Sequence, residues 1–213
     1  MRDYILIALA AAVCGRPATG EPVTRHHMAS HLGDLRDIER MLLAGQLDDA
    51  RTRAFLLTRQ PSDDALSQAV EDAAAALVQA PTIPDAIRLE AKVAAACAGC
   101  HVQSPRPLLA PVAPEAPPPT PSLKTRMARH QWAADRLWEG VVLGDERRWR
   151  QGLEVLAMRP VAMPKGDGLA RRLQAQAIDA LGAFEQRSDT YATRAQAYGE
   201  MLVTCAACHR EQR

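Results

Sequence analysis

The chain has 213 residues, of which 24% are charged and only 4% are aromatic, and its formal net charge at pH 7 is +1. Because the basic residues form no long run and few aromatic residues lie among them, the composition argues against a nucleic-acid-binding protein. The length allows one large domain or two small ones. Helix breakers are clustered and β-forming residues are sparse, which predicts an all-α protein.

The first twenty residues have the pattern of an export signal. Arg2 is followed by an apolar run of ten residues from Tyr4 to Val13, and small residues continue to the end of the segment. This run suits the core of a signal peptide and is too short to span a bilayer as a helix. We therefore expect residues 1–20 to be removed on export to the periplasm. Lipoprotein processing at Cys14, which would anchor the chain to a membrane, is the less favoured alternative because valine suits the preceding position poorly.

A proline-rich segment divides the remaining chain. Residues 105–121 contain eight prolines. This composition favours an extended polyproline II linker, which would span about 50 Å at about 3.1 Å per residue. The predicted organisation is therefore a signal peptide, a first domain at 21–104, the linker, and a second domain at 122–213. We expect no membrane-spanning segment in the mature chain.

Each domain is predicted to contain four helices with short connections, so the expected fold is two four-helix bundles in tandem. The expected helices are 23–44, 47–59, 62–79 and 84–101 in the first domain, and 123–143, 146–158, 169–187 and 189–210 in the second. Ser62 and Ser188 suit N-cap positions, and Pro84 suits the start of a helix. Gly45 and Gly144 are expected to end the first helix of each domain.

The two domains are copies of one module. A shift of 99 residues aligns Met28 with Met127 and His31 with His130. Near the ends of the domains the shift is 108 residues, so the second copy contains nine additional residues. We place this insertion in the loop at 159–168.

Each copy ends with the sequence Cys-x-x-Cys-His, which is the attachment signature of a c-type haem. The first motif consists of Cys97, Cys100 and His101, and the second of Cys205, Cys208 and His209. Two cysteines three residues apart lie on one side of a helical turn, where both can form thioethers with the vinyl groups of one porphyrin. The adjacent histidine is expected to be the proximal iron ligand. The chain is therefore predicted to carry two haem c groups, whose bulk would fill a core that is poor in aromatic residues.

A structural zinc site is the alternative for the four motif cysteines. Two Cys-x-x-Cys pairs can form a four-thiolate site if the fold brings them together. Zinc-binding pairs usually lie on tight glycine-rich turns and need no histidine after the second cysteine. Both motifs here end alanine-rich helical runs and both include the histidine, so haem is favoured over zinc.

The first helix of each copy offers candidate distal ligands for the iron. One apolar seam contains Met28, His31, Leu35, Ile38 and Leu42, and its repeat contains Met127, His130, Ala134, Leu137 and Val141. The steps alternate between three and four residues, which places each set on one inward face. In an antiparallel bundle the start of the first helix lies beside the end of the fourth, where the haem would be attached. We expect either Met28 or His31, and either Met127 or His130, to bind iron; ordinary core packing is the alternative for each residue.

These features resemble the class II cytochromes c, the family of cytochrome c-prime and its low-spin relatives. The resemblance rests on the haem motif at the end of the fourth helix in both copies and on the inward Met28 and Met127. It covers nearly all of the mature chain as a tandem pair. It implies covalent haem c, a periplasmic location, and either electron transfer or small-gas binding. Two modules in one chain, and a histidine three residues after each methionine, depart from the family pattern and leave the spin state open.

The leading hypothesis is a dihaem electron carrier that exchanges electrons with redox partner proteins. Iron with two protein ligands needs little rearrangement when its oxidation state changes. A protein that binds or senses NO or CO is the alternative, and it would need an open or displaceable sixth position on the iron. The sequence contains no recognisable acid–base pair, nucleophile constellation or glycine-rich phosphate loop, so we do not expect an enzyme.

The two copies differ in charge. Residues 21–106 contain nine Lys/Arg and twelve Asp/Glu, whereas residues 122–213 contain fifteen and eleven. Either these charges only solvate helix faces, or they help the two halves to attract each other or to dock different partners.

Overall fold

The structure is a computed structural model, which describes residues 21–59, 65–103, 115–119, 122–158, 167–187 and 190–211. The predicted signal peptide with Cys14, the predicted caps Ser62 and Ser188, and most of the linker and of the inserted loop lie outside the described residues. Side chains are described from residue 31 onward, with a few gaps that include Cys100.

All regular secondary structure in the described residues is α-helical, as the sequence predicted. The helices are α1 (Glu21–Leu43), α2 (Leu47–Leu57), α3 (Ala65–Val78), α4 (Ile83–Gln103), α5 (Leu123–Val142), α6 (Glu146–Ala157), α7 (Asp167–Glu185) and α8 (Tyr191–Glu211). None of these helices differs from its predicted range by more than three residues at either end. We refer to α1–α4 as the N-terminal group and to α5–α8 as the C-terminal group.

Hydrogen bonds from threonine side chains fix where α4 and α8 begin. The Thr82 hydroxyl accepts from the backbone N–H of Asp85 at 3.3 Å and donates to its carboxylate at 2.6 Å. At α8, the backbone N–H of Thr193 donates to the Thr190 hydroxyl at 3.2 Å, and the backbone N–H of Thr190 donates to the Thr193 hydroxyl at 2.6 Å. Such reciprocal bonds satisfy donors that have no partner inside the helix. Thr190 therefore caps the start of α8.

Glycine ends the first helix of each group, as predicted. Gly45 has a φ of +79° and Gly144 a φ of +65°, values that residues with a Cβ adopt only under strain. The backbone N–H of Gln46 donates to the carbonyl of Met41 at 2.8 Å, which closes the end of α1. Pro84 lies in the first turn of α4, where a missing backbone N–H costs no helical hydrogen bond.

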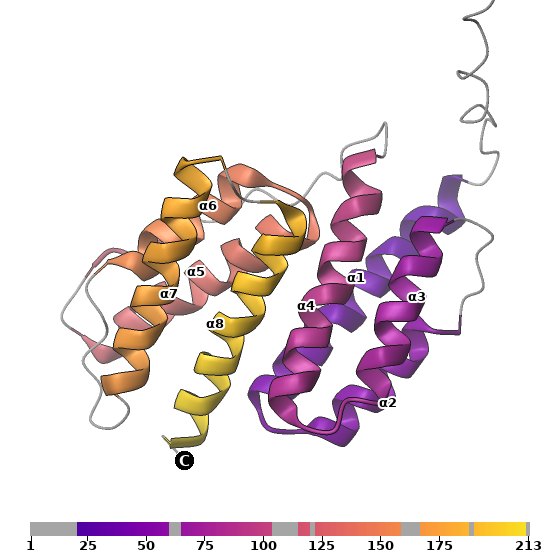
Figure 1. Ribbon diagram of the computed structural model, residues 1–213, viewed down its shortest axis with the longest axis horizontal. Coiled ribbons are helices and arrows are strands. Elements are labelled where there is room, and N and C mark those ends of the chain that lie inside the picture. Colours follow the sequence, from indigo (N-terminus) through magenta and orange to yellow (C-terminus); the bar gives the residue numbers. More distant parts are fainter. Residues whose placement is uncertain are drawn as a thin grey trace, which may run out of the picture.

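The helices contact one another in chain order within each group. Contacts join α1 to α2, α2 to α3 and α3 to α4, and α1 also contacts α4; the same pattern recurs from α5 to α8. Figure 1 shows the two groups side by side, with α4 and α8 packed together between them. These two helices are antiparallel, so α4 ends near the top of the view and α8 ends near the bottom.

The predicted apolar seams supply much of the core. Leu35, Ile38 and Leu42 of α1 are almost fully buried, as are Leu137 and Val141 of α5. Burying each of these side chains stabilises the fold by roughly 1.5–3 kcal/mol. None of the helices in the described part of the chain combines the length and the low charge needed to cross a membrane.

The described part of the proline-rich segment, residues 115–119, contains neither helix nor strand. The carbonyl of Pro117 accepts a hydrogen bond of 2.8 Å from Nη1 of Arg129 on α5. This part of the segment therefore lies against the C-terminal group.

Candidate haem attachment sites

The two Cys-x-x-Cys-His motifs lie in the last turns of α4 and α8. Cys97 and Cys205, the first cysteine of each motif, are half-buried and pack against the apolar core. Cys208 is half-buried one turn after Cys205 on the same helix. A spacing of three residues brings two side chains to neighbouring positions on one helix face, as attachment to a single porphyrin requires.

Small residues surround the motif cysteines. From residue 94 to residue 100, α4 contains only alanine, cysteine and glycine. Ala94 and Ala98 are fully buried there, and Ala206 is buried between the two cysteines of α8. Neither helix carries a bulky side chain between its motif cysteines, so no side chain there would block attachment of one porphyrin to both sulfurs.

His101 is held by a hydrogen bond to the C-terminal group. Its Nδ1 lies 2.8 Å from the carbonyl oxygen of Val142 at the end of α5. With the proton on Nδ1, the ring donates to this carbonyl and Nε2 keeps its lone pair. Histidines that bind metals commonly place their second nitrogen in such a hydrogen bond, which fixes both the tautomer and the ring orientation. Burial lowers the pKa of His101, although the carbonyl opposes this change, so the neutral form is favoured.

His130 and His209 lie close together at one end of the C-terminal group. His130 is in the second turn of α5 and His209 is near the end of α8. Burial lowers the pKa of His130, and the nearby His209 lowers it further because two charged imidazoles repel each other. His130 is half-buried, whereas His209 is exposed. Met127, the other predicted distal candidate of this copy, is half-buried one turn earlier in α5.

Less of the corresponding site in the N-terminal group is described. His31 is half-buried where the buried seam of α1 begins. The side chains of Met28 and Cys100 lie outside the described residues. The sequence prediction of either Met28 or His31 as a distal ligand therefore stays a prediction.

Burial raises the pKa of both described motif thiols of α8. The pKa of Cys205 is raised to about 12, first by burial and then by the nearby carboxylate of Glu39 and by Cys208. The pKa of Cys208 is raised by burial and by Glu211.

The antiparallel packing of α4 and α8 also separates the two motifs. The helices cross near Ala91 and Gly199. A Cβ on Gly199 would lie 3.2 Å from the Cβ of Ala91. Cys97 and Cys205 each lie six residues beyond this crossing in opposite directions, which places them about 18 Å apart along the helices. Thiolates that share a zinc ion lie only about 2.3 Å from it. Among the described side chains there is also no group of three or more His, Cys, Asp or Glu that could hold a metal ion.

Two features of these sites were not predicted from the sequence. One is the hydrogen bond between His101 and the Val142 carbonyl. It could not be predicted, because a contact with a backbone atom of another helix does not affect the residue pattern of either helix. The other is a buried polar cluster between the groups, which includes Glu39 and Glu90. A comparison of equivalent positions in the two copies could have found this cluster, because unlike residues occupy them.

No protein-family model, curated protein or solved structure matches the chain. Haem attachment is therefore inferred from the motifs and from their surroundings in this fold.

Proposed function

We propose that the protein is a dihaem c-type cytochrome that carries electrons in the periplasm. In this proposal the two helix groups are four-helix bundles in tandem, joined by the proline-rich linker, with one covalent haem in each. The observation that carries the proposal is the repetition of Cys-x-x-Cys-His at the ends of two equivalent core helices, α4 and α8. Haem iron supplies one-electron transfer when bound.

The motif residues have defined roles in this proposal. Cys97 and Cys100 hold one haem, and Cys205 and Cys208 hold the other. His101 and His209 are the proximal ligands. The hydrogen bond from His101 to the α5 carbonyl supports its role, because it leaves Nε2 free of the proton and directs the ring.

His130 is the proposed distal ligand in the C-terminal group. Its low pKa keeps the imidazole neutral, which is the form that binds metal. Its position near His209, on the neighbouring helix, supports this assignment. In the N-terminal group, His31 and Met28 are both retained as candidates. If the sixth position of each iron is occupied, electron transfer with a redox partner protein is favoured over binding of NO or CO. An enzyme's substrate would then also have no open position on the iron.

The oxidised absorption spectrum and the mass of the exported protein test this proposal together. The full chain would be produced in a bacterium that attaches haem c in its periplasm. We expect a mature mass that exceeds that of the polypeptide by two haems, a c-type α-band of the reduced pyridine adduct, and a low-spin ferric spectrum. A protein that contains zinc and no haem would overturn the proposal. High-spin iron that binds CO or NO rapidly would contradict the electron-carrier proposal and support the gas-binding alternative.

A further inference from the structure

The two helix groups meet through equivalent positions of the repeat. The 99-residue shift that aligns the first helices relates Arg36 of α1 to Asp135 of α5, and these side chains form an ion pair. The 108-residue shift that aligns the haem motifs relates Ala91 of α4 to Gly199 of α8, which are in contact. A residue beside a two-fold axis meets its own equivalent in the partner. The groups therefore pack about an approximate two-fold axis that passes between α4 and α8.

Unlike side chains also occupy two further pairs of equivalent positions near this axis. Glu39 of α1 is equivalent to Trp138 of α5, and Glu90 of α4 is equivalent to Tyr198 of α8. All four are buried, with exposed fractions of 5% or less. The N-terminal group thus contributes two acidic side chains where the C-terminal group contributes two aromatic ones.

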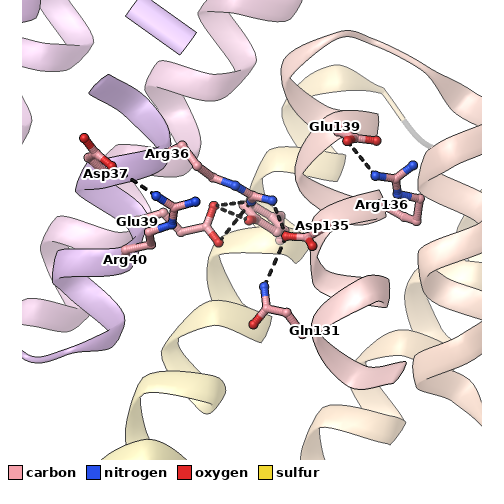
Figure 2. Close-up of polar contacts among 9 residues, drawn as sticks. Arg36, Asp37, Glu39, Arg40, Gln131, Asp135, Arg136 and Glu139 are labelled. Carbon is pink, nitrogen blue, oxygen red and sulfur yellow. Dashed lines mark hydrogen bonds and ion pairs between the residues drawn. The ribbon is translucent and has the colours of Figure 1, made fainter. Parts of the chain in front are cut away.

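Three of these four residues, Glu39, Trp138 and Tyr198, form contacts across the boundary. Figure 2 shows the Arg36 guanidinium between Glu39 and Asp135, with Nη1 3.2 Å from Oε2 of Glu39. The same guanidinium lies 4.4 Å above the ring of Trp138, a favourable cation–π distance. The Tyr198 hydroxyl donates to Oε2 of Glu39 at 2.9 Å. Each of these cross-boundary contacts joins one residue of α1 to an aromatic or acidic residue of the other group.

Pairing of two identical helix groups would remove these contacts. Two N-terminal groups packed about the same axis would place Arg36 against Arg36 and would leave Glu39 without the Tyr198 hydroxyl that donates to it. Two C-terminal groups would place Asp135 against Asp135, with no glutamate to accept from Tyr198. Like charges that face each other across an interface are a strong penalty against the wrong partner.

We propose that the face of the N-terminal group around Arg36, Glu39 and Glu90 is a docking surface specific for the C-terminal group of the same chain, and that it rejects a second copy of itself. The linker allows this closure within one chain. Pro117 of the linker is hydrogen-bonded to α5, whose 20 residues span about 30 Å. Residues 105–121 can span about 50 Å, which is longer than this helix. The opposite charge balance of the two halves also favours their association.

Cutting the linker of the folded protein tests this docking. A specific protease site would be inserted between residues 105 and 113 of the full chain, and the purified protein would be cut and diluted in steps. Native mass spectrometry distinguishes a complex of one N-terminal with one C-terminal fragment from pairs of identical fragments, whether or not haem is present. We expect only the mixed complex, and an uncut chain that is monomeric.

Two variants test the charges that specify the pairing. Asp135→Arg would place a second cation against Arg36, and we expect the fragments to separate at a concentration at least about tenfold higher than in the unaltered protein. Glu200→Arg would remove the exposed pair with Arg88, whose Nε and Oε1 atoms lie 2.6 Å apart, and we expect a smaller effect. Glu154→Arg is the matched control, because its partner Arg150 is exposed on the same helix and away from the boundary.

Several outcomes would overturn the proposal. They are pairs of identical fragments, fragments that separate immediately after cutting, an uncut chain of twice the monomer mass, and an Asp135→Arg protein that behaves like the Glu154→Arg control. Far-ultraviolet circular dichroism of each uncut variant shows whether its helices are retained. If Asp135→Arg lost its helices, Glu200→Arg would decide, and fragments that associate as tightly as the control would then contradict the proposal.

Discussion

The first two helices of each group pack against each other, but α1 and α2 do so differently from α5 and α6. Where α1 meets α2, Met41 and Ala50 occupy the positions that Gly140 and Trp149 occupy where α5 meets α6. A large and a small residue are thus present in both pairs, but in the opposite order. A Cβ on Gly140 would lie 2.6 Å from the backbone of Trp149, so α5 and α6 approach more closely than an alanine at this position would allow.

A second pair of equivalent positions shows the same contrast. Arg53 of α2 forms an ion pair of 3.0 Å with Asp34 of α1. Their equivalents in the C-terminal group are Gly152 and Ala133, and a Cβ on Gly152 would lie 2.8 Å from the Ala133 carbonyl oxygen. The N-terminal group therefore joins its first two helices partly by charge, whereas the C-terminal group joins them by close packing. Because the two scaffolds differ, we expect the two proposed haems to be distinguishable.

Removing the attachment cysteines of one group at a time is expected to have the largest effect. Cys97→Ala with Cys100→Ala should leave one haem in the C-terminal group, and Cys205→Ala with Cys208→Ala should leave one in the N-terminal group. Each protein should lose the mass of one haem and about half of the haem absorbance, since thioethers hold the group covalently. Redox titration of the two single-haem proteins would compare the sites, and retention of both haems in either protein would refute the attachment assignment.

Substitution of the distal candidates should change the spin state of one haem. His130→Ala should convert the iron of the C-terminal group from low-spin to high-spin, because it removes the imidazole placed near His209. Met127→Ala, one turn earlier on the same helix, is the matched control and should leave that iron low-spin. Electronic absorption of the oxidised proteins measures both results. The reverse outcome would make Met127 the ligand.

Gly140→Ala should destabilise the C-terminal group by about 1–3 kcal/mol, because the added methyl forces α5 and α6 apart. Gly182→Ala in α7 is the control, since a Cβ there meets nothing within 4 Å, and it should stabilise the fold by roughly 0.5–1 kcal/mol. Thermal unfolding followed by circular dichroism compares them. Equal effects of the two substitutions would contradict the close packing described for α5 and α6.

Glu90→Gln should have the smallest effect, which depends on pH. Burial raises the pKa of Glu90 well above its ordinary 4.5, the nearby Glu39 raises it further, and Arg36 opposes both. The folded protein therefore keeps a proton that the unfolded chain releases, so this group's contribution to stability is full below pH 4.5 and declines as the pH rises toward the folded pKa. The variant should lose less stability than the unaltered protein between pH 5 and pH 8.

Glu154→Gln, at an exposed position of α6, provides the comparison for this titration. It should follow the pH dependence of the unaltered protein. Identical curves for Glu90→Gln and Glu154→Gln would show that Glu90 is charged in the folded protein.

Much of the local structure was predictable because it depends on residues close together in the chain. The seam that includes Leu35, Ile38 and Leu42 repeats at intervals of three and four, which defines a helix and its buried face. Gly45 and Gly144 ended their helices because each adopts a positive φ. The reciprocal cap that Thr190 and Thr193 form at the start of α8 was not predicted from the sequence.

By itself, the sequence determined the helical class, the positions of the helices, the repeat and the two Cys-x-x-Cys-His motifs. Only the tertiary structure decided which helices face each other across the two groups. Glu90 looks like a residue of a solvated helix face, yet it is fully buried near Glu39 of α1 and Tyr198 of α8. Arg36 and Asp135 are equivalent in the repeat, but their ion pair exists only because the groups pack about an approximate two-fold axis. Contacts between residues about a hundred positions apart leave no periodic pattern in either segment, so no local feature of the sequence could fix them.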